Sequence, residues 1–452
     1  MLFNSFSFLA CFAALVVVYY AIPHRRRWAL LLVASLAYYA TFSAAYVVLL
    51  AGVTLVTYVA GLSLGNASDR RVRNAILASG AGAVLAALAV FKYPGPGIAA
   101  IAGLSFYSFS CVSYLADVHG GRLPPVRHIG RFALYVAFFP KLLAGPIERA
   151  RPFLAQITQA AHFSPGGVTL GLQLVLWGLF KKVVIADRLA PFVERAYGQP
   201  SLAPAADLVL ATYFFAFQLY CDFSGYSDIA IGSAKVLGFD LMENFRRPYF
   251  STSMREFWSQ RWHLSLASWF RDYMYVPLGG SRVPRARHVL NVMAVFMASG
   301  IWHGANWTFV VWGGLNGLFT VMSTALTGTN MPRGFIARVL GAVVTFHLVL
   351  ITWVFFRADT LADAITILTR VAGSAATVVP LTVVRLQTGD VMLSVLLIAV
   401  LLGIEGFDEV RPVWSRLTAW PLPLRWAAYY ALILSLIVLG TWNLEQFVYL
   451  RF

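Results

Sequence analysis

The chain has 452 residues, of which 59% are hydrophobic and only 12% are charged, whereas soluble proteins carry roughly 25% charged residues. This composition excludes an ordinary soluble domain and predicts a polytopic membrane protein. The 35 lysines and arginines exceed the 19 acidic residues and leave a net charge of +16. Since such an excess is typical of cytoplasmic loops and also suits anionic lipid head groups, no nucleic-acid partner is expected.

Apolar runs of nearly 20 residues recur along the chain, with short polar loops between them. Each run is long enough to cross a hydrocarbon core of about 30 Å as a helix. The sequence therefore predicts an all-α fold with roughly ten to twelve transmembrane helices. Residues 1–23 hold no charged side chain, so they lack the basic start of a signal peptide and predict a first helix that is retained.

Arginines mark alternate loops in the first third of the chain. The stretches 24–27, 70–73 and 122–131 together hold nine arginines, while the loops between them hold one lysine. Basic residues gather on the cytoplasmic side of membrane proteins. We therefore expect these three loops to be cytoplasmic and the N-terminus to be extracytoplasmic.

Two segments are unsuited to a lipid-facing helix. Residues 139–153, FPKLLAGPIERARPF, are polar and proline-rich, and irregular backbone at membrane depth is tolerated only inside the protein or around a wet cavity. Residues 239–288 mix about ten basic residues with many aromatic ones, which favours interfacial or re-entrant elements that wall a cytoplasm-facing vestibule. Within them, YVPLGGSR at 275–282 predicts a turn.

Beyond residue 288 the pattern returns to apolar spans, expected at 336–356, 391–404 and 425–442, with ordinary loops at 370–390 and 405–425. Earlier in the chain, Asp222 and Asp228 are six residues apart and do not share one face of a regular helix, so they are not expected to act as a carboxylate pair. Neither a P-loop nor a cluster with zinc-ligand spacing is present, which leaves nucleotide hydrolysis and metal catalysis without support.

The stretch 296–317, FMASGIWHGANWTFVVWGGLNG, contains one titratable side chain, His303. An ionisable residue among apolar ones in a membrane protein is a functional-site hypothesis by default, although spacing alone equally fits a packed structural histidine. Asn306 follows three residues later and shares a helix face with His303. It is a candidate to orient the imidazole or to donate to an oxyanion; the alternative is an interhelical hydrogen bond.

Four blocks of this sequence, together with the opening MLFNSFSFL, resemble the bacterial membrane-bound O-acyltransferases, in particular the membrane subunits that acetylate alginate. The blocks are FFPKLLAGPIERARPF at 138–153, the long stretch from YCDFSGYSD to YVPLGGSR at 220–282, SGIWHGANWTFVVWGGLNG at 299–317, and FHLVLITWVFFRAD at 346–359. The resemblance implies a bowl of helices around a central tunnel, with an active-site histidine near the middle of the membrane.

The resemblance also implies roles for particular residues. His303 matches the essential histidine of the family and would act as general base. His263 stands where eukaryotic relatives carry an asparagine, which makes it a supporting candidate on the donor side, and His347 resembles a second histidine of the D-alanyl-transferring branch. Asn316 departs from the pattern, because alginate-type members carry a histidine there.

Neither of these two further histidines is assigned by residue pattern alone. His347 is the one strongly polar side chain of its run, and it fits either a proton shuttle or a bond to a neighbouring carbonyl. His263 has arginine-rich and tryptophan-rich surroundings that suit an interface. Arginines near it fit the phosphates of coenzyme A, since guanidinium groups match phosphate oxygens, or simple positive-inside anchoring; the candidates are Arg255, Arg261, Arg271 and Arg282.

We therefore expect an inner-membrane O-acyltransferase, in particular an O-acetyltransferase, without a bound cofactor or metal. The expected donor is a cytoplasmic thioester, acetyl-coenzyme A or an acyl carrier, and the expected acceptor is an extracytoplasmic polysaccharide such as alginate, reached directly or through a periplasmic or membrane-anchored partner transferase. The alternatives are a lipid or protein acceptor, or a transporter or flippase with a histidine relay. One membrane-embedded domain is expected, with N-terminal helices in 1–138, a catalytic core in 139–360 and C-terminal helices in 361–452.

Overall fold

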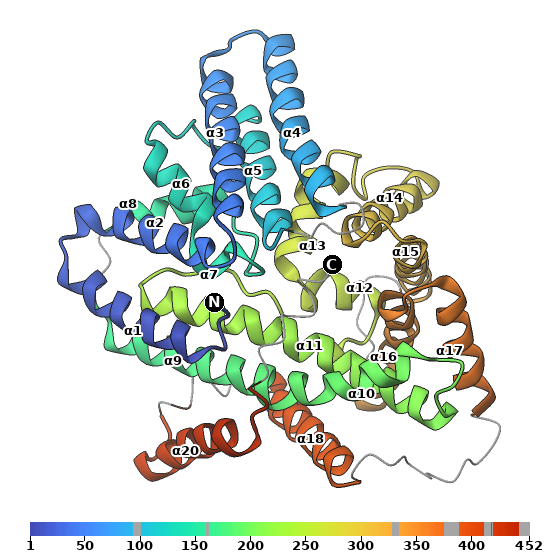
Figure 1. Ribbon diagram of the computed structural model, residues 1–452. Helices are drawn as coiled ribbons and strands as arrows, with labels where there is room; N and C mark the ends of the chain where they lie inside the picture. The colour runs from blue at the N-terminus through green and yellow to red at the C-terminus, as the bar shows by residue number, and fades with distance from the viewer. Residues whose placement is uncertain are drawn as a thin grey trace. The chain divides into compact units, whose positions relative to one another are not determined.

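The computed structural model describes residues 1–93, 101–159, 162–327, 334–374, 388–410, 417 and 419–442. Throughout these ranges the chain is helical or irregular and forms no strand (Figure 1). The all-α prediction is therefore confirmed. The described residues fall into two compact units, one made of 1–179 with 226–243 and the other of 180–225 with 244–445. The limits predicted at 138 and 360 stay a prediction.

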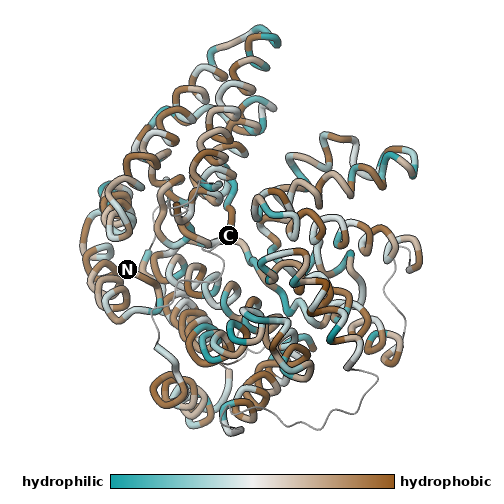
Figure 2. The backbone as a smooth tube through the Cα atoms, turned by 45° about the vertical axis from the view of Figure 1, so that its right-hand side comes forward, coloured by the Kyte–Doolittle hydropathy of each residue, from teal (hydrophilic) through white to brown (hydrophobic). Residues whose placement is uncertain are grey.

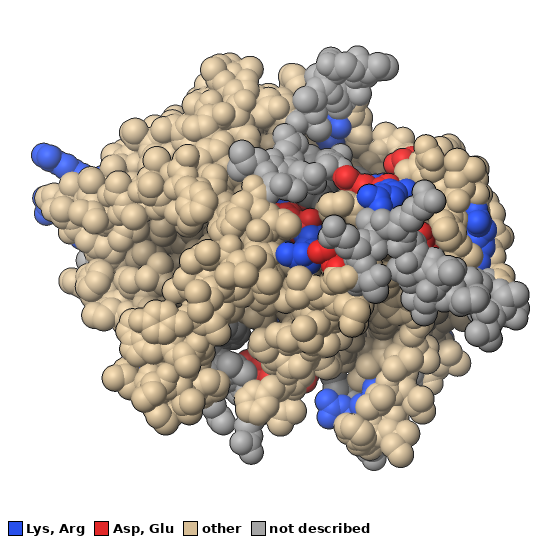
Figure 3. All heavy atoms as spheres, turned by 60° about the horizontal axis from the view of Figure 1, so that its bottom comes forward, with Lys and Arg blue, Asp and Glu red and all other residues tan. Residues whose placement is uncertain are grey.

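Seven helices in the described ranges are long and apolar enough to cross a membrane, and they identify a multi-pass membrane protein. They cover Ala44–Asn66, Arg70–Lys92, Pro165–Gly198, Trp307–Leu326, Phe335–Arg357, Gly389–Val410 and Leu422–Leu439. The sequence predicts ten to twelve transmembrane helices. The number of long apolar helices is lower because some apolar runs form shorter helices, such as α1 (Phe6–Ala21) with 16 residues. In the view of Figure 3 most surface atoms belong to uncharged residues.

The first unit begins with α1, which lies within the apolar stretch 1–23 that predicts a first helix, and it continues with further helices. Its helices are α1, α2 (His24–Ala40), α3 (Ala44–Asn66), α4 (Arg70–Lys92), α5 (Leu104–His119), α6 (Ile129–Ala137), α7 (Phe139–Leu142), α8 (Ala150–Thr158) and α9 (Pro165–Leu179). Helices α3, α4 and α5 pack against one another (Figure 1). Gly80 permits this packing, since a Cβ atom there would lie 2.9 Å from the Cβ of Ala60. Apolar residues run along most of α3 and α4 (Figure 2).

The proline-rich segment 139–153 lies inside the first unit, as its composition predicts. The side chains of Lys141 and Glu148 are 3% and 4% exposed. The ammonium of Lys141 lies 4.6 Å from the centre of the Tyr135 ring, and Glu148 accepts a hydrogen bond from the backbone N–H of Met242 at 2.5 Å. Burial lowers the pKa of Lys141 to about 8, although the charge of Glu148 acts in the opposite direction.

The second unit contains the later long helices and several short helical segments, three of them π-helical. Its helices are η1 (Phe180–Ala186), α10 (Asp187–Gly198), the first part of α11 (Ala205–Val236), α14 (Arg285–His303), α15 (Trp307–Thr327), α16 (Phe335–Arg357), α17 (Leu361–Ser374), α18 (Thr388–Val410) and α20 (Leu422–Leu439). Within η1, buried Lys182 binds Asp222 at 2.6 Å and Asp187 at 2.7 Å. Asp222 thus has a lysine as its partner, consistent with the expectation that it does not work as one of a carboxylate pair.

The basic aromatic segment forms short helical pieces as far as residue 275, and its expected interfacial or re-entrant position stays a prediction. These pieces are η2 (Pro248–Phe250), α12 (Met254–Glu256), η3 (Phe257–Arg261), α13 (Leu264–Phe270) and η4 (Arg271–Tyr275). Two backbone hydrogen bonds join the start of this segment to its middle: the N–H of Arg246 donates to the carbonyl of Arg261 at 2.8 Å, and the N–H of Leu264 donates to the carbonyl of Asn244 at 2.9 Å. The predicted turn near 275–282 is present, with positive φ at Gly279.

The loop predicted at 405–425 is wrong at its start, because α18 continues to Val410. The acidic residues at the end of α18 are typical of a solvated loop in sequence, but in the structure their carboxylates bind other side chains. Glu405 accepts a hydrogen bond from the Tyr220 hydroxyl at 2.5 Å, and Glu409 binds Arg261 at 2.7 Å. In the predicted loop 370–390, α17 extends to Ser374, and residues 375–387 lie outside the described ranges.

Candidate active site

His303 is the last residue of α14, at the tip of a hairpin that α14 forms with α15 (Figure 1). The hairpin is tight because glycines lie where the two helices cross. A Cβ atom on Gly300 would lie 2.4 Å from the carbonyl oxygen of Phe309, and one on Gly313 would lie 2.5 Å from that of Phe296. Small residues allow such close backbone approach between membrane helices. The crossing places His303 at the tip of the hairpin, where α14 ends and shortly before α15 begins.

Aromatic rings surround the imidazole of His303, which is 5% exposed. The ring centres of Trp302, Trp312 and Phe356 lie 4.6, 5.0 and 5.1 Å from that of His303, all in edge-to-face arrangements. Phe309 stacks at 6.3 Å. Phe356 comes from α16, whereas the other three rings belong to the α14–α15 hairpin. This enclosure, which we call the aromatic box, keeps water from the imidazole.

Asn306 caps the start of α15. Its side-chain oxygen accepts a hydrogen bond from the Thr308 N–H at 3.2 Å, and its amide donates to the carbonyl of Asp359 at 2.8 Å. Asparagine is among the favoured residues at this helix position. The bond to Asp359 joins the hairpin tip to the residues that follow α16. The expected shared helix face with His303 is wrong, because α14 ends at His303 and Asn306 lies in the exposed turn before α15; the roles of orienting His303 or binding an oxyanion stay predictions.

Asn316 is completely buried on α15. Its oxygen accepts a hydrogen bond from the indole N–H of Trp258 at 3.1 Å, and its amide donates to the carbonyl of Trp312 at 2.8 Å. The Trp258 ring lies edge-on to that of Trp312, 5.5 Å away. The residue that departs from the family pattern thus supports the wall of the aromatic box.

His263 lies between η3 and α13 with its side chain 3% exposed. Its φ of 46° is left-handed, and Arg247 is the one other non-glycine residue in the described ranges with a positive φ. Such strain is typical of functional sites. The Nδ1 atom lies 2.9 Å from the Asn244 side-chain oxygen, which also accepts from the Ser265 hydroxyl at 2.9 Å. Since an amide oxygen only accepts, Nδ1 carries the proton and Nε2 is the basic nitrogen.

Burial alone lowers the pKa of His263 to about 3. The imidazole is therefore neutral throughout the physiological range. Asn244, which sets this tautomer, was not singled out from the sequence. It lies inside the block 220–282, but nothing in the spacing of the two residues indicates their contact.

The four candidate donor-binding arginines are in different environments. Arg255, Arg271 and Arg282 are exposed, and Arg271 pairs with its neighbour Asp272 at 2.8 Å. Arg261 is 7% exposed, and carboxylates hold its guanidinium: Glu256 at 2.6 Å and Glu409 at 2.7 and 3.0 Å. The exposed three remain candidates for phosphate binding.

His347 lies away from the aromatic box. It precedes Phe356 by nine residues on α16, which separates the two by about 14 Å along a regular helix. Its Nδ1 donates to the carbonyl of Val343 at 2.8 Å, and the Tyr213 hydroxyl lies 2.9 Å from its Nε2. The structural alternative, a bond to a nearby carbonyl, is thus present, and the shuttle role stays a prediction.

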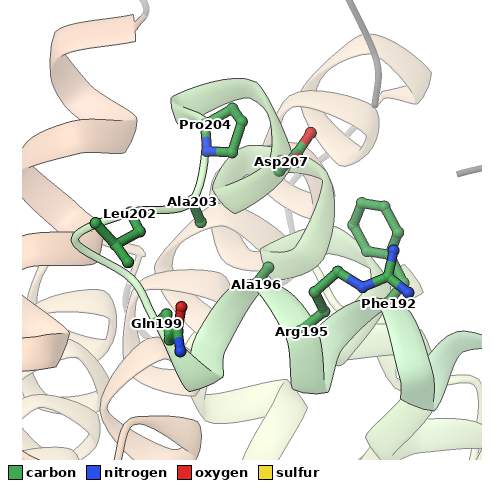
Figure 4. Close-up of a pocket in the computed structure, with 8 residues that line it drawn as sticks. All are labelled: Phe192, Arg195, Ala196, Gln199, Leu202, Ala203, Pro204 and Asp207. Carbon is green, nitrogen blue, oxygen red and sulfur yellow. The ribbon is translucent and has the colours of Figure 1, made fainter. Parts of the chain in front are cut away.

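A pocket of about 190 Å³ opens between α10 and the start of α11 (Figure 4). The side chains of Arg195 and Asp207 come from opposite sides of it, and apolar side chains such as Phe192 complete the lining. It contains none of the candidate histidines. Among the residues that the structure describes, no group of three or more histidine, cysteine or acidic side chains is placed to hold a metal ion.

Comparison with known proteins gives one family. Residues 108–357 match MBOAT, the membrane-bound O-acyltransferase family. A protein of Azotobacter vinelandii named probable alginate O-acetylase AlgI is 38% identical over 80% of this chain and 76% of its own length. A peptidoglycan O-acetyltransferase of Helicobacter pylori is 30% identical over 76% of this chain and 73% of its own. A teichoic acid D-alanyltransferase of Bacillus subtilis is 26% identical over 57% and 68%.

Proposed function

Since this chain belongs to the membrane-bound O-acyltransferase family, we propose that it transfers acetyl groups from a cytoplasmic thioester to hydroxyl groups of an extracytoplasmic polysaccharide. The relatives carry names of enzymes that acetylate alginate or peptidoglycan, and both acceptors are polymers with sugar hydroxyls. The alginate-related proteins have the higher identity, which favours a polymer of that kind.

The observation that carries the proposal is the position of His303 in the aromatic box. Imidazole has an unperturbed pKa of about 6.5, close to operating pH, so it can take a proton from an attacking hydroxyl and return it to the leaving group. The box excludes water that would otherwise hydrolyse the thioester. His303 is the general base of this proposal.

His263 is proposed to act on the donor side. Its Nδ1–H donates to Asn244, which fixes the ring and leaves Nε2 to accept a hydrogen bond. The exposed arginines Arg255, Arg271 and Arg282 supply guanidinium groups for the phosphates of acetyl-coenzyme A. His347, bonded to Tyr213, is a second candidate for proton transfer.

The membrane setting of the proposal follows from charge. We assign the arginine-rich stretches near residues 24–27, 70–73 and 122–131 to the cytoplasmic side of a bacterial inner membrane. The N-terminus is then on the extracytoplasmic side. A partner transferase, periplasmic or membrane-anchored, would complete delivery to the polymer. Co-purification of such a protein with the full chain tests this part separately.

The test of the function uses the full chain reconstituted in liposomes with acetyl-coenzyme A labelled in its acetyl group. Alginate oligosaccharides and peptidoglycan fragments serve as acceptors. Label is expected in an acceptor with the wild type, and His303→Gln is expected to lower the rate by about 10²–10⁴, the usual cost of removing a general base. Transfer by His303→Gln at the wild-type rate overturns the role of the histidine, and absence of label from every acceptor, with any co-purified partner included, overturns the proposed reaction.

A further inference from the structure

Two buried hydrogen-bond donors lie one turn apart on α15. Thr308 and Trp312 are each 1% exposed, and their spacing of four residues places them on one helix face. In the described part of the chain, neither the hydroxyl of Thr308 nor the indole N–H of Trp312 has a hydrogen-bond partner. Leaving a buried donor unpaired costs about 1–3 kcal/mol, so two of them side by side require an explanation.

The position of Thr308 explains why its hydroxyl is available. Other buried helical threonines donate to a carbonyl in the preceding turn, as Thr54 does to Leu50 at 2.6 Å and Thr212 to Leu208 at 2.7 Å. Thr308 is the second residue of α15, so no helical turn precedes it. Its hydroxyl lies at the positive end of the helix dipole, where negative charge is stabilised.

The indole of Trp312 contrasts with that of a neighbouring tryptophan. The N–H of Trp258 donates to Asn316, which shows that this part of the core does supply acceptors. The Trp312 ring instead lies 5.0 Å from His303, at an interplanar angle of 84°. The available indole donor and the histidine are thus direct neighbours, with the Thr308 hydroxyl one turn away on α15.

We propose that the indole N–H of Trp312 and the hydroxyl of Thr308 form the oxyanion hole of the acyl transfer. This assignment rests on the proposed role of His303 as general base. It makes Trp312 and Thr308 catalytic residues, because both would bond the carbonyl oxygen of the acyl group in transit. Two donors aimed at one oxygen are the usual composition of such a site.

The reaction step balances with these groups alone. The acceptor hydroxyl oxygen attacks the thioester carbonyl carbon while His303 takes its proton, and the carbonyl electron pair moves to oxygen. That oxyanion accepts hydrogen bonds from Trp312 and Thr308. When it collapses, the carbon–sulfur bond breaks, and the leaving thiolate takes the proton back from the imidazolium. One carbon–oxygen bond has replaced one carbon–sulfur bond.

The test compares variants that remove one donor and keep its shape. Trp312→Phe and Thr308→Val are each expected to lower kcat for transfer from labelled acetyl-coenzyme A by about 100-fold, as loss of one oxyanion donor does. The KM for acetyl-coenzyme A and the pH profile should stay unchanged, because the base is intact. Trp353→Phe is the matched control: it removes another buried indole N–H from the same core, but its ring lies one ring farther away, stacked on Trp312.

A second substitution guards against simple misfolding. Benzothienylalanine at position 312 keeps the two-ring shape of tryptophan and replaces the N–H with sulfur, so it should lose as much kcat as Trp312→Phe. Wild-type kcat in Trp312→Phe and Thr308→Val, or an equal loss in Trp353→Phe, overturns the assignment. If His303→Gln is inactive in the same assay while these variants are fully active, only the oxyanion hole fails; if His303→Gln is fully active, the proposed role of the histidine fails.

Discussion

Glu409 binds Arg261 through both of its carboxylate oxygens, at 2.7 and 3.0 Å. The same carboxylate also binds Arg247 at 2.7 Å. It thereby joins the end of α18 to both ends of the segment that leads to His263. Because Arg261 stands two residues before His263, this ion pair supports the left-handed backbone of the histidine.

Removing Glu409 should therefore destabilise the protein. Glu409→Ala takes one of two carboxylates from Arg247 and from Arg261, which keep Asp408 and Glu256; since Glu409 is 20% exposed, the cost should be below the about 3–5 kcal/mol of breaking a fully buried ion pair. We expect a clear fall in the melting temperature of the purified protein in detergent. Arg271→Ala is the control, because its pair with Asp272 is exposed and should contribute at most about 1 kcal/mol. Equal melting temperatures for Glu409→Ala and wild type would contradict this role.

The glycine crossing of the α14–α15 hairpin should not accept a side chain. Gly313→Ala places a Cβ atom only 2.5 Å from the backbone oxygen of Phe296, so the helices must separate and the aromatic box must open. Both thermal stability and transfer activity should fall. Gly314→Ala, one residue away, meets only the sulfur of Met297 at 3.8 Å and should behave as wild type or slightly better, since alanine favours helix. The comparison is made on melting temperature and transfer rate.

His263 should make the protein sensitive to acid. Its pKa is about 3 in the folded state and about 6.5 when unfolded, so the unfolded state binds more protons between these values. The stability contributed by the neutral histidine is present above about pH 6.5 and is lost as the pH falls toward 3, by up to about 1.4 kcal/mol per pH unit. Melting temperatures measured from pH 7 to pH 4 should fall more steeply for wild type than for His263→Gln. Parallel curves would show that the histidine titrates normally.

Asn316 should act through the tryptophan that it holds. Asn316→Ala leaves the indole N–H of Trp258 without its acceptor, at a cost of about 1–3 kcal/mol, and loosens the ring that packs on Trp312. We expect a lower melting temperature and a lower kcat. Asn316→His, which restores the residue type of alginate-family relatives, keeps an acceptor for Trp258 and should recover both. If Asn316→Ala and Asn316→His are equally impaired, the hydrogen bond to Trp258 is not what matters.

Much of the fold is predictable from hydropathy and charge. The apolar runs at 336–356 and 425–442 give α16 and α20 within about three residues of their observed ends, because in lipid a helix satisfies its own backbone. The charge of 239–288 excludes one long apolar span there, and the segment indeed forms short helical pieces up to residue 275. Hydropathy fails where charged groups pair inside the fold: Lys182 in η1 and Glu409 at the end of α18 have partners distant in sequence, which no local pattern reveals.

The candidate site is predictable only in part for the same reason. His303 stands out as a titratable residue in an apolar run, and its neighbour Trp302 is visible beside it. Phe356, which closes the aromatic box, is 53 positions away and reaches it only through the packing of α16. The contact between His263 and Asn244 likewise depends on a left-handed backbone turn that sequence does not announce.

The glycine crossing has a consequence for how substrates reach His303. Three rings of the aromatic box belong to one hairpin, whose two backbones are in close contact. We therefore expect these three rings to keep their positions relative to one another. Phe356 alone is carried by a different helix. We therefore expect any opening of the aromatic box to take place between Phe356 and the hairpin, which the bond from Asn306 to Asp359 connects to the residues after α16.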